Sequence, residues 1–480
     1  MDDRAFLDGL TDILGPKGVA TQADDLAPWL TDWRERVTGD ALALVSPKNV
    51  GQVQDIVRLA SDAGVAIVPQ GGNTGMVAGG VPCPGDRAIL LSLRKMNAIR
   101  SIDPADNSLT AEAGAILSHV HAAAEEHGRR FPLSLGAKDS ATIGGLIATN
   151  AGGTQVLRFG SMRNLTLGVE AVLPDGSLFE GLSTLRKDNR GYDLRQLLAG
   201  SEGTLGIITA ASLKLIPAAP HRTVAWIGLG SASDALALLR LLESEVGDAV
   251  ESFELVPQAA LELVLKHIPG TRAPLAGEHR WNVLTELRSA ADGDELRAQC
   301  EAGLAAALDQ GLIADAVIAE SEAQAEAFCK IREVISEAER ADGRAAKHDV
   351  SVPVSAMPRF IEDATQAVED RFAGTRVVAF GHLGDGNVHF NVRAPAGGND
   401  AAWLAETGPE VSSFVHDLTH EVGGSLSAEH GIGQLKLSEF ARVADPTRLS
   451  ALRAIKQALD PLGIMNPGKL VPLANPGDNP

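Results

Sequence analysis

The sequence lacks an apolar run long enough to cross a bilayer, and its first residues lack the features of a targeting signal. The opening stretch, MDDRAF, has neither the basic nor the apolar region of a secretion signal, and it is too acidic for a transit peptide. These absences exclude a bilayer-spanning helix. We therefore expect a cytoplasmic protein without stable membrane insertion.

Cysteine is scarce, and its spacing excludes two common roles. Cys83, Cys300 and Cys329 fit neither a paired disulfide framework nor a Cys-x-x-Cys motif. Such residues are expected to be free thiols in a reducing compartment. A thiol-based mechanism is therefore disfavoured.

Positive charge is in deficit. The chain has 42 Lys and Arg against 62 Asp and Glu, which gives a formal net charge of −20. A surface of this sign repels nucleic acid and anionic membranes at long range. An anionic small substrate would also be repelled unless a local cluster of Arg and Lys received it. The charge excludes a nucleic-acid partner and makes any local basic cluster informative.

The 480 residues are too many for one hydrophobic core. Glycine and short β-type runs dominate the region from about 40 to 218. Amphipathic helices alternate with strands from there to about 425. We predict an α+β protein with domains over residues 1–218 and 219–425, and a helical, then irregular, segment over 426–480. We expect residues 474–480 to be disordered.

Three glycine-rich loops lie in the first of these domains. The loop VPQGGNTGMVAGG (68–80) can turn several backbone N–H groups toward a phosphate or pyrophosphate. Small residues throughout 132–153 indicate backbone pressed against a large flat ligand. The third loop, 197–209, turns at Ser-Glu-Gly-Thr just before a strand. Each alone is also explained by a plain loop or by close packing of a helix on a sheet, but three together favour one ligand.

Two histidines flank a turn in GHLGDGNVHFNV, residues 381–392. The dipeptide Asp385-Gly386 predicts the turn but does not explain His382 and His389. Two imidazoles at the mouth of a hairpin can bind a divalent metal, or can form a hydrogen-bonded structural pair. The pattern alone leaves both interpretations open.

A carboxylate in SAEHGIGQ can complete a metal site. Glu429, placed with His430 at a predicted strand-to-helix corner, would make a two-His, one-carboxylate set with open coordination positions. A competing pair is present in FVHDLTHEV. There His416 and His420 lie four apart on a predicted helix.

The three loops, in this order and spacing, closely resemble the FAD-binding domain of the vanillyl-alcohol oxidase / p-cresol methylhydroxylase family. Residues 35–472 resemble its 2-hydroxy-acid branch, the D-2-hydroxyglutarate and D-lactate dehydrogenases. The resemblance includes the motifs GHLGDGNVHFNV, SAEHGIG and NPGKL, each of which is specific by itself. The resemblance implies a two-subdomain FAD-binding domain, a substrate- and metal-binding cap domain, and a C-terminal segment that completes the active site.

The resemblance also implies that FAD is bound without a covalent link. Asn73 stands where covalent members carry a histidine after a Gly-Gly pair. The residues expected to contact FAD are Gln70, Gly71, Gly72, Asn73, Thr74, Gly75, Ser134, Leu135, Gly136, Ser140, Gly144, Gly145, Ala148, Asn150, Gly152, Gly153, Glu202, Gly206, Ile208 and Asn466.

For the metal, the resemblance favours His382, His389 and Glu429 over the helical pair, with zinc or manganese as the ion. It also implies that His430 is the base that removes the hydroxyl proton. Asn391 lies two residues after His389, on the same strand face, and can hold a substrate oxygen.

The resemblance places the substrate carboxylates at a basic cluster formed by Arg332, Ser336 and Lys347. Arg332 and Ser336 are four apart on a predicted helix and share a face. The alternative for Arg332 is a surface pair on that helix. Two positions depart from the branch: Ser336 stands where threonine is usual, and His348 where tyrosine is typical.

The expected reaction is oxidation of D-2-hydroxyglutarate to the 2-oxo acid by hydride transfer to flavin N5, with D-malate as a further candidate substrate. The electrons would pass to an electron-transfer flavoprotein or a quinone, and a homodimer is expected. A D-lactate dehydrogenase needs less of a second carboxylate clamp and is the nearest alternative. A flavin-free metallohydrolase and a non-catalytic FAD-binding subunit are the others.

Overall fold

The computed structural model describes residues 1–473, and the chain divides into two compact units. Unit 1 contains residues 1–153 and 160–218 together with the chain from Glu429 onward. Unit 2 contains residues 154–159 and 219–428. The short segment 154–159, expected in the first domain, therefore packs with unit 2. Residues 474–480, for which we expected disorder, lie outside the described residues.

Unit 1 begins with a four-stranded sheet in the order β1 (Val19–Ala20), β2 (Ala43–Val45), β4 (Ala88–Ser92), β3 (Ala66–Gln70). β4 runs parallel to β2 and to β3. Helix α3 (Val50–Ala63) joins β2 to β3 and buries Val53, Ile56, Val57 and Ala60, the spacing of one helix face. It starts where Asn49 accepts a hydrogen bond from the N–H of Gln52.

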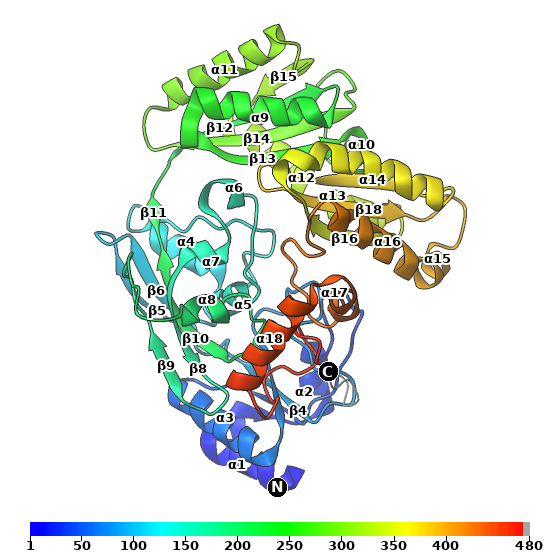
Figure 1. Ribbon diagram of the computed structural model, residues 1–480. Coiled ribbons are helices and arrows are strands. Elements are labelled where there is room, and N and C mark those ends of the chain that lie inside the picture. The colour runs from blue at the N-terminus through cyan, green and yellow to red at the C-terminus, as the bar shows by residue number, and fades with distance from the viewer. Residues whose placement is uncertain (474–480) are drawn as a thin grey trace. The chain divides into compact units, whose positions relative to one another are not determined.

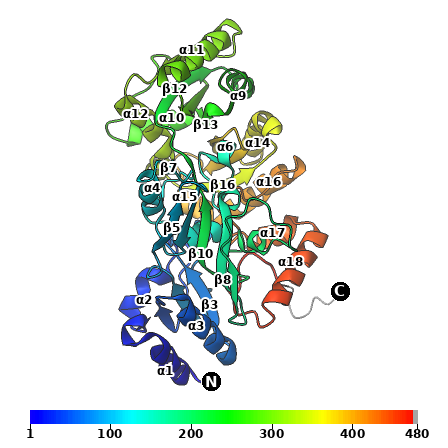
Figure 2. The ribbon, with the colours of Figure 1, turned by 90° about the vertical axis from the view of Figure 1, so that its left-hand side faces the viewer.

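The second sheet of unit 1 is antiparallel and has the order β5 (Ile99–Asp103), β6 (Ser108–Glu112), β10 (Ile207–Lys214), β8 (Thr166–Val172), β9 (Leu178–Gly181). Figure 2 shows β8 and β10 side by side. The remaining elements of the unit are α1 (Asp3–Leu14), α2 (Ala23–Leu30), α4 (Leu117–Glu125), α5 (Ile143–Ala148), α7 (Met162–Leu165), α8 (Leu194–Leu198), α17 (Leu437–Val443), α18 (Pro446–Leu459) and the paired strands β7 (Arg129–Arg130) and β11 (Ile216–Pro217).

Unit 2 is built on a seven-stranded antiparallel sheet. Its order is β15 (Asp315–Ile318), β12 (His221–Leu229), β14 (Trp281–Ser289), β13 (Val250–Pro257), β17 (Arg376–His382), β18 (Asn387–Arg393), β16 (Ala345–Ser351). The predicted alternation of helices and strands in this region is therefore confirmed.

Helices cover both faces of this sheet (Figure 1). One core forms between one face and α9 (Ala232–Val246), α11 (Gly293–Asp309), α14 (Met357–Arg371) and α16 (Gly408–Glu421). A second core forms between the other face and α10 (Gln258–His267), α12 (Glu322–Glu333) and α13 (Ile335–Asp342). The short helices α6 (Val156–Phe159) and α15 (Asp400–Glu406) complete the unit.

The predicted hairpin is present: β17 and β18 pair directly, with His382 opposite Asn387 and Phe380 opposite His389. Gly386 in the turn has φ of +82°, and a Cβ there would lie 2.1 Å from the carbonyl oxygen of Val352. Only glycine fits both conditions.

Two local predictions are wrong. The single helix expected to carry both Arg332 and Ser336 is two helices, α12 and α13, which meet at Val334, whose φ of −90° and ψ of 6° are not helical. Ile331 on α12 and Ile335 on α13 belong to the same core. Glu429 and His430 follow an isolated bridge at Ser425 rather than a strand, and α17 begins only at Leu437.

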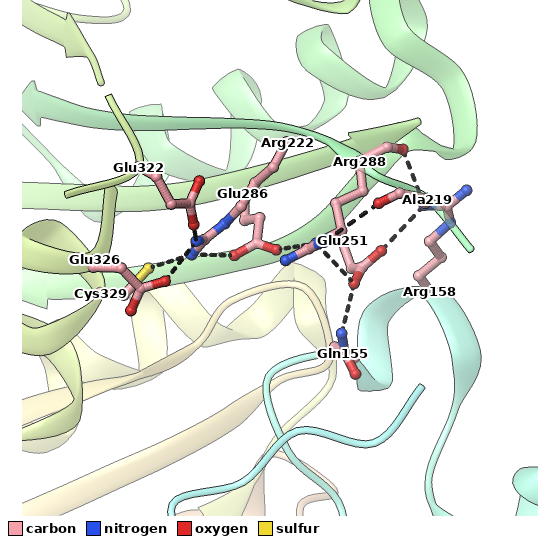
Figure 3. A network of polar contacts seen from close by, with 10 residues as sticks. All are labelled: Gln155, Arg158, Ala219, Arg222, Glu251, Glu286, Arg288, Glu322, Glu326 and Cys329. Atoms are coloured by element: carbon pink, nitrogen blue, oxygen red, sulfur yellow. Dashed lines mark hydrogen bonds and ion pairs between the residues drawn. The ribbon is translucent and has the colours of Figure 1, made fainter. Parts of the chain in front are cut away.

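A charged network fixes α12 to the sheet (Figure 3). Arg222 on β12 contacts Glu286 on β14 at 3.0 Å and Glu326 on α12 at 2.8 Å. Its other guanidinium contacts are with Glu322 and with the sulfur of Cys329. The network holds the helix whose last turn carries Arg332.

The structure bears on two of the expectations above, the state of the cysteines and the presence of a membrane-spanning helix. Cys83, Cys300 and Cys329 are free thiols. Burial raises the pKa of Cys300 and of Cys329 to about 12, so both are protonated at neutral pH. Among the described residues, no helix combines the length and the apolar character needed to cross a membrane.

Candidate functional site

A cavity of about 370 Å³ lies within unit 1. Its walls come from residues 69–80, residues 135–152 and residues 202–208, together with Glu429 and His430. The three glycine-rich loops therefore line one cavity. Glu429 and His430, the predicted metal ligand and base, line it as well.

Glycines serve two different purposes around this cavity. At Gly71 and Gly72 an added Cβ would lie 2.2 Å from Thr142 Oγ1 and 2.1 Å from the carbonyl oxygen of Ser140. These two are required by close packing of one loop on another. Gly75 and Gly136, in contrast, line the cavity and have no atom within 4 Å of such a Cβ. Their backbone is exposed to whatever fills the cavity.

Most residues expected to contact FAD lie on its walls. These are Gln70, Gly71, Gly72, Asn73, Thr74, Gly75, Leu135, Gly136, Gly144, Gly145, Ala148, Gly152, Glu202, Gly206 and Ile208.

Five expected residues, Ser134, Ser140, Asn150, Gly153 and Asn466, do not line the cavity. The carbonyl oxygens of Ser134 and Ser140 pack against Gly153 and Gly72. The side-chain Oδ1 of Asn150 accepts hydrogen bonds from the Ser161 hydroxyl and from the backbone N–H of Arg163. The Asn466 amide donates to the carbonyl oxygens of Gly79 and Glu202. These contacts hold the loops in place.

Glu202 fixes the turn that follows His430. Its carboxylate accepts hydrogen bonds from the N–H groups of Ile432 and Gly433, both at 2.7 Å. Gly431 has φ of +81°, and a Cβ there would lie 2.7 Å from the same carboxylate. Burial raises the pKa of Glu202, and the two N–H groups offset only part of this effect. The Ser-Glu-Gly-Thr turn thus contributes both to the cavity and to the placement of His430.

A second polar cluster lies within unit 2, at the end of the β17–β18 hairpin. The rings of His382 and His389 stand nearly perpendicular, with centroids 5.6 Å apart. Glu254 on β13 accepts a hydrogen bond from Nδ1 of His382 at 2.6 Å. Because a carboxylate only accepts, Nδ1 carries the hydrogen, and Nε2 is the nitrogen suited to a metal. Asp349 lies 4.0 Å from Nδ1 of His389.

Glu254 also holds Arg332. The Nε of Arg332 donates to the other carboxylate oxygen of Glu254 at 2.8 Å, and its guanidinium lies 4.9 Å from the ring centre of Phe380. Its Nη2 is buried and has no hydrogen-bond partner among the described residues. Burial alone would raise the pKa of Glu254, but His382 and Arg332 together lower it below its ordinary value.

A second buried glutamate holds Lys347 and Asn391, two more of the predicted substrate-binding residues. Glu339 on α13 accepts hydrogen bonds from Lys347 at 3.1 Å and from the Asn391 amide at 2.8 Å. Lys347 and Asn391 face each other across β16 and β18. Ser336 is exposed on α13, beyond the break at Val334, so it does not continue the helix that carries Arg332.

The expected basic cluster is therefore not a region of net positive charge. Arg332 and Lys347 each have a buried carboxylate partner, Glu254 and Glu339. The reason is desolvation, because a cation taken out of water needs a counter-charge. What the cluster offers an anion is an oriented, unsatisfied donor rather than a long-range field.

The competing histidine pair belongs to no three-ligand cluster with metal spacing among the described residues. His420 is exposed, and His416 is buried edge-on against His348, with centroids 5.7 Å apart. His348 is itself bonded to the carbonyl oxygen of Phe390 and the hydroxyl of Ser412. Within residues 1–473, no cluster of ligand-type side chains with metal spacing includes His416 or His420.

Sequence reasoning missed Glu254 and Glu339, which belong to no motif. A signal was available for Glu254. It lies with Glu251 in the segment VESFELVP, a strand in which two acidic residues stand among mostly apolar ones. Both are buried, which is rare for glutamate without a partner.

Two family models match the chain. Residues 41–181 match the FAD binding domain, and residues 218–470 match the C-terminal domain of FAD linked oxidases. The chain is 39% identical over 451 residues to the D-2-hydroxyglutarate dehydrogenase of Xanthomonas citri pv. viticola, covering 94% of this chain and 93% of the relative. It is 35% identical over 480 residues to a putative mitochondrial D-lactate dehydrogenase of Schizosaccharomyces pombe, covering 98% and 88%.

Among solved structures, p-cresol methylhydroxylase with substrate bound superposes with a TM-score of 0.74 at 16% identity, covering 97% of this chain and 96% of that one. At this identity the match concerns the fold. The chain thus has the p-cresol methylhydroxylase type of fold that the glycine-rich loops predicted.

Proposed function

Because this chain belongs to the FAD-linked oxidases, an FAD-dependent oxidoreductase family, we propose that it oxidises D-2-hydroxyglutarate to 2-oxoglutarate. The name of the Xanthomonas relative supports this substrate. The structural observation that carries the proposal is the buried Nη2 of Arg332, a donor without a partner among the described residues. A second carboxylate on the substrate would satisfy it.

The cavity of unit 1 fits FAD. The open backbone at Gly75 and Gly136 can approach a large flat ligand without side-chain interference. The chemistry that FAD supplies when bound is the acceptance of a hydride at N5. Asn73 donates to the carbonyl oxygen of Thr31 and lines the cavity, so we propose that FAD is held without a covalent bond.

The donor set fits a divalent metal, with His382, His389 and Glu429 as the proposed ligands and zinc or manganese as the ion. Glu254 supports this role of His382 by leaving Nε2 as the unprotonated nitrogen. Glu429 directly follows Ala428, whose N–H donates to the carbonyl oxygen of Asp349 at 3.2 Å. The chemistry that the metal supplies when bound is Lewis acidity toward the substrate hydroxyl.

The chain's own residues then divide the work. His430 removes the proton from the 2-hydroxyl, because a neutral imidazole nitrogen can accept a proton as a general base. Asn391 is proposed to orient a substrate oxygen, and Arg332 to bind the distal carboxylate. The electron acceptor is proposed to be an electron-transfer flavoprotein or a quinone, and the assembly a homodimer in the cytoplasm.

Arg332→Ala is expected to lower kcat/KM for D-2-hydroxyglutarate by about 10–100-fold, since a charge-assisted hydrogen bond contributes roughly 1.5–3 kcal/mol. D-Malate, which also has a second carboxylate, should be affected too. D-Lactate has no distal carboxylate to lose, so its turnover should change little. Steady-state rates with an artificial electron acceptor measure all three substrates.

Arg340→Ala is the matched control, because Arg340 is an exposed arginine on the adjacent helix α13. It should leave all three substrates unaffected. An equal fall for D-2-hydroxyglutarate and D-lactate in Arg332→Ala would mean that Arg332 does not bind the second carboxylate. The D-lactate reaction, which the name of the Schizosaccharomyces relative favours, would then become the better proposal.

A further inference from the structure

Glu254 occupies an unusual position in unit 2. Its side chain is 2% exposed, and each of its two carboxylate oxygens accepts a hydrogen bond from a different predicted site residue. One accepts from His382 Nδ1 at 2.6 Å and the other from Arg332 Nε at 2.8 Å. One carboxylate therefore links the metal-ligand histidine to the arginine of the substrate site.

The fold fixes this link from two sides. Glu254 and His382 are directly opposite each other where β13 pairs with β17, so the sheet register sets their distance. Arg332 comes from α12, which the Arg222 network ties to β12 and β14 (Figure 3). Both side chains therefore approach Glu254 from elements that other contacts also hold in place.

We propose that Glu254 is a shared positioning residue that fixes both the tautomer of His382 and the direction of Arg332. The inference rests on the proposed function, because it takes His382 as a metal ligand. It goes further by making metal affinity depend on the residue that binds the substrate carboxylate.

Glutamine at position 254 cannot do both tasks. It offers one acceptor oxygen and one donating NH₂ group, whereas His382 and Arg332 both donate. Arg332 is always charged and makes the stronger hydrogen bond, so it keeps the oxygen. The NH₂ group then faces His382 Nδ1 and moves the ring hydrogen to Nε2, the nitrogen that the metal needs. The charge of Arg332, no longer balanced by a carboxylate, would also weaken binding of a metal cation at His382.

The test is zinc affinity, measured by titrating Zn²⁺ into the chelator-stripped, FAD-loaded protein against a chromophoric zinc chelator. Glu254→Gln should bind Zn²⁺ about 10–100-fold more weakly, the usual cost of losing the partner of a metal-ligating histidine. Adding Arg332→Ala to this variant should recover most of the loss, because the glutamine oxygen is then available to His382. A merely structural role of Glu254 predicts that the double variant is worse.

Glu251→Gln is the control for neutralising a buried carboxylate. Glu251 lies on the same strand, has a 1% exposed side chain, and contacts Gln155, Arg158 and Arg288 rather than the predicted site residues (Figure 3). Its zinc affinity should match the wild type. Glu254→Asp keeps two acceptor oxygens and should lose less affinity than Glu254→Gln. This variant answers the question if the glutamine variant does not fold, which FAD content and thermal melting report.

Wild-type affinity in Glu254→Gln, or a double variant no better than the single one, would overturn the inference. So would equal losses in the aspartate and glutamine variants. A wild type without zinc affinity would overturn it together with the metal site. The choice of substrate is tested separately, because flavin reduction by D-2-hydroxyglutarate is measured without reference to these titrations.

Discussion

His430→Asn is expected to lower kcat by about 10²–10⁴-fold, the usual contribution of general-base catalysis. FAD and metal should remain bound, because the asparagine keeps the turn that Glu202 holds through Ile432 and Gly433. The rate of flavin reduction after anaerobic mixing with substrate measures the effect directly, since it precedes any electron acceptor.

Two further readings decide what a loss in His430→Asn means. FAD absorbance and metal content equal to wild type show that only the proton transfer was removed. A flavin-reduction rate close to that of wild type, in a sample where hydride transfer limits turnover, would exclude His430 as the base. The Glu202 carboxylate, which lines the same cavity, would then be the next base to test.

Removal of the metal is expected to abolish turnover and to leave FAD bound. Two of the three proposed ligands, His382 and His389, lie in unit 2. The third, Glu429, lines the cavity of unit 1, but the three glycine-rich loops of that cavity supply no ligand. EDTA should therefore eliminate activity without releasing yellow colour, and added Zn²⁺ or Mn²⁺ should restore it. His389→Ala should lose the metal permanently, as measured by elemental analysis of the purified protein.

His420→Ala is the matched control for this experiment. It removes an exposed histidine from α16, the helix of the competing pair, and should retain both metal and activity. Metal content that survives in His389→Ala and falls in His420→Ala would move the site to that pair. Activity that survives complete metal removal would instead contradict the Lewis-acid role.

Local signals predicted much of this structure. The turn of the β17–β18 hairpin was evident from Asp385-Gly386. The three glycine-rich loops predicted one shared cavity because small residues at so many positions need a common cause. Each of these features depends on residues close together in sequence, where backbone geometry and periodicity decide the outcome.

What the sequence could not predict depends on long-range contacts. Glu254 and His382 are 128 residues apart, and Glu339 and Asn391 are 52 apart. No local pattern assigns such partners. No local pattern marks the break at Val334 either, because the apolar spacing continues through it, with Ile331 and Ile335 four residues apart in the same core. The sequence predicted a basic cluster because the carboxylates that balance Arg332 and Lys347, Glu254 and Glu339, belong to none of the motifs.

This balance changes how the protein is expected to select an anionic substrate. With a net charge of −20 and paired cations at the site, attraction at long range is weak. Selectivity is instead expected from short-range contacts, chiefly the unsatisfied Nη2 of Arg332. Discrimination between dicarboxylates and monocarboxylates should then depend little on ionic strength.

The most direct measurement of the central claim is reduction of the bound flavin by each substrate in the absence of oxygen and of any acceptor. The wild-type protein should lose its flavin absorbance on addition of D-2-hydroxyglutarate, with a higher reduction rate per unit substrate concentration than with D-lactate. Bleaching that is as efficient with D-lactate, or absent with D-2-hydroxyglutarate, would contradict the account.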